Sequence, residues 1–200
     1  IKKMNTFNNL EKRIAILLAN FPKTKIFLKK IYQRINFILY NKNISFTLNP
    51  NMIINKISIS NEESFFGYYG SSPLNNSNEY LIFHSTKYST INKPDKSNPI
   101  NIVLFNCING MPITTFQTFA YNWQQGSKLT WIDQNHFIFN DYDNLKDIYI
   151  SKIVNVQNKK IQKIIDHPIY DVKSSVGLSV SFDRLDICEP DYGYRNKKDK

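Results

Sequence analysis

The stretch WQQGSKLTWIDQNHFIFNDYD, residues 123–143, contains two short apolar runs that are separated by a polar turn. The runs LTWI and HFIFN flank Asp133, Gln134 and Asn135 and are rich in aromatic and β-branched residues. This arrangement is typical of two β-strands that are joined by a tight turn. Because the same arrangement recurs along the chain, it decides the predicted fold.

Short β-prone runs continue from Ser45 to Phe182 and are punctuated by turn residues. They include SFTL, IINKISIS, SFFGYYG, EYLIFHS, NIVLFNC, ITTFQTF, DIYISKIVNV, KIQKII, IYDV and GLSVSF. EYLIFHS, NHFIFND and VGLSVSF place Phe83, Phe139 and Val180 at matching positions, 56 and 41 residues apart. One hairpin, with its turn at Asn109-Gly110, lies between the first two, and another lies between the second and third. Each unit is therefore predicted to contain four antiparallel strands, which is the pattern of a propeller blade.

The sequence thus predicts a mainly β chain, namely a partial β-propeller of about two and a half four-stranded blades preceded by an N-terminal helical segment. The first blade is predicted over about residues 65–119 and the second over about residues 126–165, and a third begins near Pro168. A closed ring needs roughly four to eight blades. We therefore expect the propeller domain, residues 44–200, to be truncated at its C-terminus.

Residues 1–43 form a separate basic amphipathic segment. They hold ten Lys and Arg against one acidic residue, a net charge of +9, whereas the rest of the chain holds sixteen against fifteen, a net charge of +1. Helical spacing predicts a first helix over residues 10–21, and Pro22 suits the first turn of a second helix. Basic side chains surround an apolar stripe on the second helix, formed by Phe27, Leu28, Ile31, Ile35, Ile38 and Leu39. Two interpretations stay open: an α-hairpin that packs on protein, or contact of residues 8–40 with an anionic membrane surface.

Composition argues against several classes of function. The β region lacks the charge excess of a nucleic-acid-binding domain, so no nucleic acid is expected as a partner. The chain has two Cys and three His, which argues against a disulfide framework and a multi-histidine metal centre, and we expect neither a metal nor another cofactor. No apolar run approaches the roughly 20 residues that span a bilayer, and no secretory signal is readable. We expect a cytoplasmic protein, peripheral at the inner membrane if its basic helices bind lipid.

Several motifs carry a resemblance to a known family. FFGYYGSSPLNNSNEYLIFH, WQQGSKLTWI with FIFNDYD, HPIYDVKSSVGLSVSFDRL and PDYGY resemble successive landmarks of a bacterial β-propeller family whose members are mostly uncharacterised. Members are often encoded near glycosyltransferases for surface polysaccharides, which implies a glycan or protein partner in that biosynthesis. The resemblance covers about residues 65–194, and Asp191 stands where the family usually has Gly.

The broader resemblance is to TolB-like and oligogalacturonate-lyase-like propellers. The lyase group uses a histidine-rich metal site, and the matching stretch YNWQQGS contains no histidine. Metal-dependent lyase chemistry is therefore not carried over to this chain.

Polar residues within these landmarks are the candidate ligand-binding residues. Gln124 and Gln125 can exchange donor–acceptor pairs with sugar hydroxyls, and Trp123 beside them offers an apolar platform. Tyr69 offers both stacking and hydroxyl contacts. The alternative for each is a structural role, in hydrogen bonds to neighbouring backbone or in packing between blades.

Asn140, Asp141 and Arg184 complete the predicted ligand site. The acid of Asn140-Asp141, at the end of HFIFN, can serve as a base or a metal ligand, or it can bond turn backbone. Arg184 can clamp a carboxylate or phosphate, or it can bridge two blades. His84, a lone strand histidine, is expected to be structural. No catalytic residue is assigned, because no second carboxylate pairs with Asp141 as in glycosidases and no phosphate-binding loop or nucleophile elbow is present.

Two functional hypotheses remain. The leading one is a β-propeller binding protein that recognises a glycan in surface-polysaccharide biosynthesis. The alternative is a carbohydrate-active enzyme, a glycosyltransferase or a lyase, whose site is completed by blades outside this sequence. Fold alone does not separate them, because propellers host both kinds of function.

Overall fold

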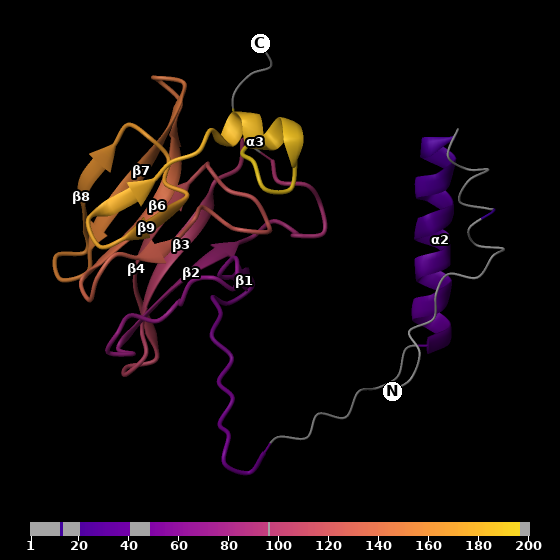
Figure 1. Cartoon of the computed structure of the whole chain (residues 1–200). Coiled ribbons are helices and arrows are strands. Elements are labelled where there is room, and N and C mark those ends of the chain that lie inside the picture. Colours follow the sequence, from indigo (N-terminus) through magenta and orange to yellow (C-terminus); the bar gives the residue numbers. More distant parts are fainter. Residues whose placement is uncertain (1–12, 14–20, 41–48, 96, 197–200) are drawn as a thin grey trace. The chain divides into compact units, whose positions relative to one another are not determined.

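The computed structural model describes residue 13 and residues 21–40, 49–95 and 97–196. The chain divides into two compact units, Ile1–Asn55 and Lys56–Lys200. It is mainly β, with antiparallel sheets in the second unit and a long helix in the first (Figure 1). Within the described residues, no helix is both long enough and apolar enough to cross a membrane.

Helix α2 spans Pro22–Tyr40, as the sequence predicts. Pro22 occupies the first helical position, where its missing N–H leaves no helical hydrogen bond unmade. The other predicted helix, over residues 10–21, falls outside the described residues except at Arg13 and Phe21. The α-hairpin therefore stays a prediction.

Four strands form the first sheet: β1 (Glu63–Phe65), β2 (Tyr80–Thr86), β3 (Ile100–Asn106) and β4 (Met111–Thr118). They are hydrogen-bonded in the order β1-β2-β3-β4, and every pair is antiparallel. The predicted turn at Asn109-Gly110 is confirmed, because Asn106 at the end of β3 pairs with Met111 at the start of β4. Gly110 has a φ of 66°, a left-handed conformation that suits glycine.

The second sheet repeats this plan with β5 (Thr130–Trp131), β6 (His136–Asp143), β7 (Ile148–Asn155) and β8 (Lys160–Ile165). Its order is β5-β6-β7-β8, again antiparallel throughout. The sequence prediction of two successive four-stranded antiparallel units is therefore confirmed. Phe83 and Phe139, predicted to be equivalent, both lie in the second strand of their sheet.

One local motif closes several turns of the β unit. An Asn or Asp side-chain oxygen accepts the N–H groups two and three residues later, at Asn106, Asn122, Asp143 and Asn155. The residue four positions later then has a positive φ, at Gly110, Gly126, Asp147 and Lys159. Asn and Asp favour such turns because their short side chains replace a backbone acceptor. The turns at Asn106, Asp143 and Asn155 therefore follow from local sequence and fix the register of the strands that they join, whereas the turn at Asn122 lies within the β4–β5 connection.

The two sheets pack on each other through one buried apolar cluster. The first sheet supplies Ile82, Ile102 and Leu104, and the second supplies residues that include Phe137, Phe139 and Val154. These side chains are almost fully buried, and burial of large apolar side chains is the main driving force of folding. The core of the β unit thus lies between the sheets.

The run IINKISIS, residues 53–60, was predicted as a strand, and this prediction is wrong. The structure has no strand over these residues, and β1 starts at Glu63. Ile57 and Ile59 instead pack on a second apolar cluster, formed by Phe83, Val103 and Phe105 on the first sheet. The alternation of apolar residues therefore reflects packing over a sheet face and not strand pairing.

The third predicted unit also differs from the prediction. β9 (Asp171–Lys173) and β10 (Val176–Leu178) form a two-stranded sheet, and helix α3 (Phe182–Cys188) follows it. Val180 lies outside any strand, so its predicted equivalence with Phe83 and Phe139 is wrong. Ser181 caps α3 by accepting the N–H of Arg184, which ends the extended segment. Val180 is still partly buried, because it packs on the cluster around Tyr142, Tyr149, Phe182 and Tyr194.

Candidate functional site

A cavity of about 230 Å³ lies where three connecting segments of the β unit meet. The β2–β3 connection contributes Thr90, Lys93 and Pro94, and the β4–β5 connection contributes residues 119 and 121–124. The segment after α3 supplies the remaining wall, with Pro190, Asp191, Gly193, Arg195 and Asn196. We call it the Trp123 cavity, after the largest side chain that lines it.

Aromatic side chains of the β4–β5 connection hold the β2–β3 connection against the cavity. The indole N–H of Trp123 donates to the carbonyl of Asn92 at 2.7 Å. The hydroxyl of Tyr121 lies 3.1 Å from the carbonyl oxygen of Asp95 and 2.9 Å from that of Asn98. Burial raises the pKa of Tyr121 to about 12, so this hydroxyl stays protonated near neutral pH. The ring of Trp123, rather than its N–H group, is left to contact a ligand.

Amide side chains fix the opposite wall of the cavity. Asn122 donates through Nδ2 to the carbonyl of Tyr192 at 2.9 Å. The side-chain amide of Asn196 donates to the carbonyl of Phe119 at 2.8 Å, and the backbone N–H of Asn196 donates to the hydroxyl of Tyr149 at 3.0 Å. The segment after α3 is thus tied to the β unit on both sides of the cavity.

Charged groups also line the cavity. Lys93 and Asp191 are exposed, and Arg195 is half-buried. The guanidinium of Arg195 pairs with Asp186 at 2.9 Å and donates to the carbonyl of Pro190 at 3.2 Å. A guanidinium has five N–H donors, so Arg195 keeps capacity for an acidic group. The lining thus contains two cationic side chains and one carboxylate, and Asp186 outside the lining already pairs with one of the cations, Arg195.

Of the residues predicted from the sequence, Gln124 lies at this cavity. It is exposed and lines the wall beside Trp123. Gln125 is buried and lines a separate, much smaller cavity of about 20 Å³ with Lys128, Tyr170 and Asp171. Tyr69 is 88 % exposed and packs on Tyr68, with ring centroids 4.3 Å apart. The structure therefore places these three predicted residues in three different surroundings.

Asn140 and Asp141 are buried in structural hydrogen bonds. Asn140 donates to the carbonyl of Ile169 and accepts its N–H, both at 2.8 Å, and Asn140 also contacts the hydroxyl of Tyr194 at 3.1 Å. Asp141 accepts the N–H of Phe119 at 2.8 Å and pairs with Lys152. Neither residue lines the two cavities described above. Successive strand residues point to opposite faces of a sheet, so the two side chains do not meet.

Arg184 lies on helix α3, away from the lining of both cavities. It is exposed, and its backbone N–H donates to Ser181 at 3.3 Å. The predicted group Gln125, Asn140, Asp141 and Arg184 is therefore not gathered at one cavity. A ligand-binding role for each stays a prediction.

His84 is fully buried and joins the two sheets. Its Nε2 atom accepts the N–H of Ser127 at 3.0 Å, and the Ser127 hydroxyl lies 3.0 Å from the same atom. The ring stacks on Phe65 at 4.8 Å, and a β-carbon at Gly126 would lie 2.2 Å from its Cε1 atom. Burial lowers the pKa of His84 to about 4, and the backbone of Phe66 and Phe65 offsets only part of this effect. The imidazole is therefore neutral near pH 7.

Asn140 makes the equivalent contact one sheet later. His84 and Asn140 are both the fifth residue of the second strand in their sheet. Each accepts a backbone N–H from the segment that leads into the next sheet, Ser127 before β5 and Ile169 before β9. The two positions thus have the same structural task, although their side chains differ.

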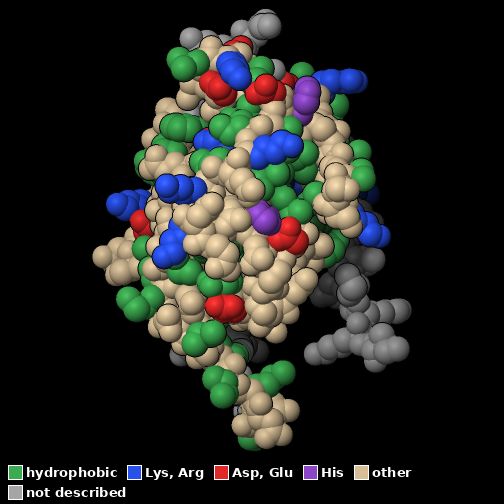
Figure 2. Space-filling view, turned by 90° about the vertical axis from the view of Figure 1, so that its left-hand side faces the viewer, with side chains coloured by type: hydrophobic (Ala, Val, Ile, Leu, Met, Phe, Trp, Pro, Cys, Tyr) green, Lys and Arg blue, Asp and Glu red, His purple; other side chains and the backbone are tan. Residues whose placement is uncertain are grey.

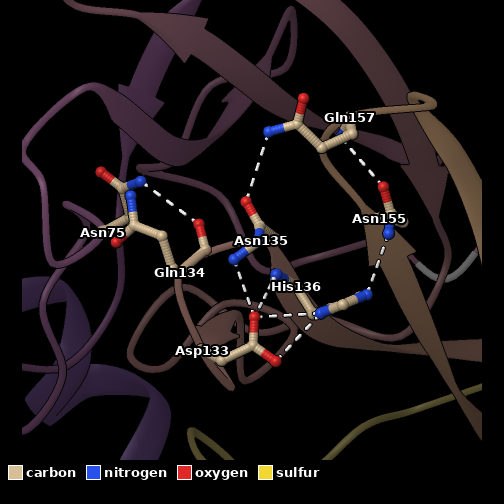
Figure 3. Close-up of polar contacts among 7 residues, drawn as sticks. All are labelled: Asn75, Asp133, Gln134, Asn135, His136, Asn155 and Gln157. Atoms are coloured by element: carbon tan, nitrogen blue, oxygen red, sulfur yellow. Dashed lines mark hydrogen bonds and ion pairs between the residues drawn. The ribbon is translucent and has the colours of Figure 1, made fainter.

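A polar cluster surrounds the β5–β6 turn (Figure 3). Both carboxylate oxygens of Asp133 lie 2.9 Å from Nδ1 of His136, and Nε2 of His136 lies 3.0 Å from the Asn155 amide. Burial opposes ionisation of Asp133, but N–H groups of Asn135 and His136 and the His136 ring together lower its pKa. Both ring nitrogens of His136 therefore have partners within the cluster, which stabilises the turn.

On the face shown in Figure 2, basic and acidic side chains are interspersed and do not form a patch of one sign. Among residues 21–40, 49–95 and 97–196, no group of three or more His, Cys, Asp and Glu is placed to hold a metal ion.

Comparison with known proteins gives no relative for this chain. No family model, curated protein or solved structure matches it. We therefore infer function from the cavity and from the residues that build it.

The sequence indicated Trp123 and Gln124 but missed Lys93, Asn122, Tyr121 and Arg195. Asn122 carried a local signal, since it begins the same five-residue turn as Asn106 and Asn155. Lys93 and Arg195 had no such signal, because only the folded chain brings their segments to the β4–β5 connection.

Proposed function

We propose that this protein binds an acidic glycan in the Trp123 cavity. The observation that carries the proposal is the composition of the Trp123 cavity. Its lining includes the aromatic ring of Trp123, the exposed amide of Gln124 and two cationic side chains. A sugar ring presents C–H faces that pack on aromatic side chains and hydroxyls that bond to amides. Lys93 and Arg195 suit the carboxylate of an acidic sugar through charge-assisted hydrogen bonds.

The cavity volume limits the ligand portion that it holds. Cavities for drug-sized ligands are roughly 300–1,000 Å³, and this one is about 230 Å³. It therefore suits a single residue of a longer glycan, with the rest of the chain lying outside. Surface-polysaccharide biosynthesis is the setting that the family resemblance implies for such a ligand.

We further propose that the β unit is built of successive propeller blades. The two sheets share one strand order, and His84 and Asn140 hold the segment that leads into the next sheet in the same way. Stacked repeats bury continuous apolar surface between neighbours, which agrees with the cluster between the sheets. In a propeller, connecting segments such as those around Trp123 gather at one face, where ligands commonly bind.

A carbohydrate-active enzyme is the alternative function. Asp191 places one carboxylate at the cavity, whereas glycoside hydrolysis generally uses two. We therefore propose binding without turnover. Mass spectrometry of a bound glycan after long incubation tests this point, since a shortened or extended product would favour the enzyme.

A glycan array tests the proposed function. The full chain should bind acidic bacterial polysaccharides more strongly than neutral ones, and Trp123→Ala should weaken that binding by at least about tenfold. Gln124→Ala should weaken it by roughly two- to tenfold, the loss of one net hydrogen bond. Gln157→Ala removes another exposed amide, on the β7–β8 turn, and should bind as wild type. Absence of binding to any acidic glycan, or equal binding by the Trp123 and Gln157 variants, would overturn the proposal.

A further inference from the structure

Helix α2 carries a basic and an apolar surface that the proposed glycan site does not use. Its sequence, PKTKIFLKKIYQRINFILY, contains five basic residues and no acidic one. The large apolar side chains on it are exposed, including Phe27 at 63 %, Ile38 at 70 % and Leu39 at 67 %. Exposed apolar surface of this extent on one element marks an interaction site more often than a solvated surface.

Six of the large apolar residues of α2 lie on one face, and Phe37 and Tyr40 fall outside it. At about 100° per residue, six side chains fall within about 120° of the helix circumference: Phe27, Leu28, Ile31, Ile35, Ile38 and Leu39. Tyr32 lies at one edge of this face, where its hydroxyl can stay in water while its ring is covered. An apolar face of this width is typical of an amphipathic helix that buries one side against an apolar partner.

The basic residues border this face on both sides. Lys23, Lys30 and Arg34 follow one border, and Lys25 and Lys29 lie beyond the other. Long basic side chains in such positions can bury their methylene stems along apolar surface while the charged ends reach outward. The charges would then meet the plane of lipid headgroups as the apolar face enters the acyl boundary.

We propose that helix α2 binds the surface of bilayers that contain anionic phospholipids. Charge complementarity selects this occupant, because each basic residue near an anionic bilayer contributes about 1 kcal/mol, and α2 has five such residues without an acidic one to oppose them. The helix lies along the surface in this proposal and does not span the bilayer. Together with the glycan site proposed above, on which this last step rests, such binding anchors the β unit at a membrane surface.

Co-sedimentation of the full chain with vesicles tests the proposal. Vesicles of phosphatidylcholine with phosphatidylglycerol should bind the protein, pure phosphatidylcholine vesicles should bind it far less, and added salt should weaken the binding. Removal of two charges in Lys29→Gln/Lys30→Gln should weaken binding by about 25-fold, or about fivefold per charge. Trp123→Ala, which lies outside α2, should bind the vesicles as wild type.

Two matched variants separate membrane insertion from simple charge attraction. Ile35→Glu places a negative charge on the apolar face, and Gln33→Glu places the same charge on the opposite face, two residues away. Gln33→Glu should weaken binding by about fivefold, whereas Ile35→Glu should weaken it by roughly a hundredfold because it also removes buried apolar surface. Equal effects of the two variants would overturn the proposal.

The remaining outcomes are also decisive. Failure of the wild-type chain to bind phosphatidylglycerol vesicles contradicts the proposal. If Ile35→Glu instead lowers the unfolding temperature while the double lysine variant binds vesicles as wild type, the apolar face packs on protein and the proposal is wrong. Should Ile35→Glu fail to fold, the double lysine variant and the salt dependence still decide, because neither alters the apolar face.

Discussion

Alanine substitutions at Gly126 and Gly110 form a matched pair that tests how tightly the His84 side chain is packed. Both glycines have a left-handed backbone, with φ values of 60° and 66°. A β-carbon at Gly126 would lie 2.2 Å from Cε1 and 2.5 Å from Nε2 of His84, whereas a β-carbon at Gly110 would meet no atom within 4 Å. Alanine at the two positions therefore shares the backbone cost and differs only in the contact with the imidazole.

The magnitudes follow from this difference. The left-handed conformation costs alanine about 1 kcal/mol, so Gly110→Ala should lower the free energy of unfolding by that amount. Gly126→Ala adds overpacking, which costs about 1–3 kcal/mol, and its total should be about 2–4 kcal/mol. Displacement of the ring also removes the acceptor of the buried Ser127 N–H, which favours the upper end of that range.

Urea unfolding of the full chain, followed by tryptophan fluorescence, measures both variants. Trp123 and Trp131 are the two tryptophans of the chain, and both lie in the β unit. Equal destabilisation by Gly110→Ala and Gly126→Ala would refute the inference that the buried imidazole is fixed between the sheets.

Three further predictions concern buried polar groups of the β unit. Because burial lowers the pKa of His84 to about 4 from the usual 6.5, protons bind the unfolded chain preferentially as the pH falls between these values. The free energy of unfolding should then drop by up to about 3 kcal/mol over this range, and His84→Gln should flatten the dependence; an unchanged pH profile in the variant would contradict this. Asp141→Asn breaks the buried pair with Lys152 and should lower the free energy of unfolding by roughly 3 kcal/mol. Asp166→Asn breaks the exposed pair with Lys146 and should lower it by less than about 1 kcal/mol. Equal losses of stability in urea unfolding would count against a stabilising role of the buried pair. Asn140→Ala should lower stability by roughly 3 kcal/mol without changing glycan binding on an array, and retained stability with weakened binding would instead support its predicted place in a ligand site.

The sequence predicted those turns, strands and helix ends that depend on a few neighbouring residues. The Asn109-Gly110 turn, the strands around Phe83 and Phe139, and the start of α2 at Pro22 each depend on a few neighbouring residues. These features were predicted because turn chemistry and apolar alternation act over short distances.

Other features depend on tertiary packing, and sequence reasoning missed them. Val180 continues an apolar alternation that resembles a strand, but Ser181 caps a helix immediately after it. A Ser before the acidic residue Asp183 was a readable start signal for that helix. Ile57 and Ile59 alternate like strand residues, yet they cover a sheet face instead of joining a sheet. In both cases the apolar pattern indicates which side chains are buried, and only the folded chain determines which segments form hydrogen-bonded strands.

The residues of the candidate site also fall into a group that the sequence predicted and a group that it did not. Trp123 and Gln124 were predicted because they stand together in one motif. Lys93 and Arg195 were not, since the contacts of Trp123 with Asn92 and of Asn122 with Tyr192 bring their segments together only in the folded chain. Asn140 and Asp141 looked like site residues because polar side chains in an apolar strand stand out, and the structure gives both of them buried structural partners.

The two indole N–H groups offer the most direct test of the proposed glycan site. Trp123 lines the cavity and donates to Asn92, whereas Trp131 packs in the core between the sheets and donates to Pro73 at 2.9 Å. Titration of the full chain with an acidic oligosaccharide that binds on the array, followed by the two indole N–H signals in a nitrogen–proton correlation spectrum, reads both positions at once. A saturable shift of the Trp123 signal with an unmoved Trp131 signal is the predicted result. An unmoved Trp123 signal at saturating oligosaccharide would contradict the assignment of the cavity as the glycan site.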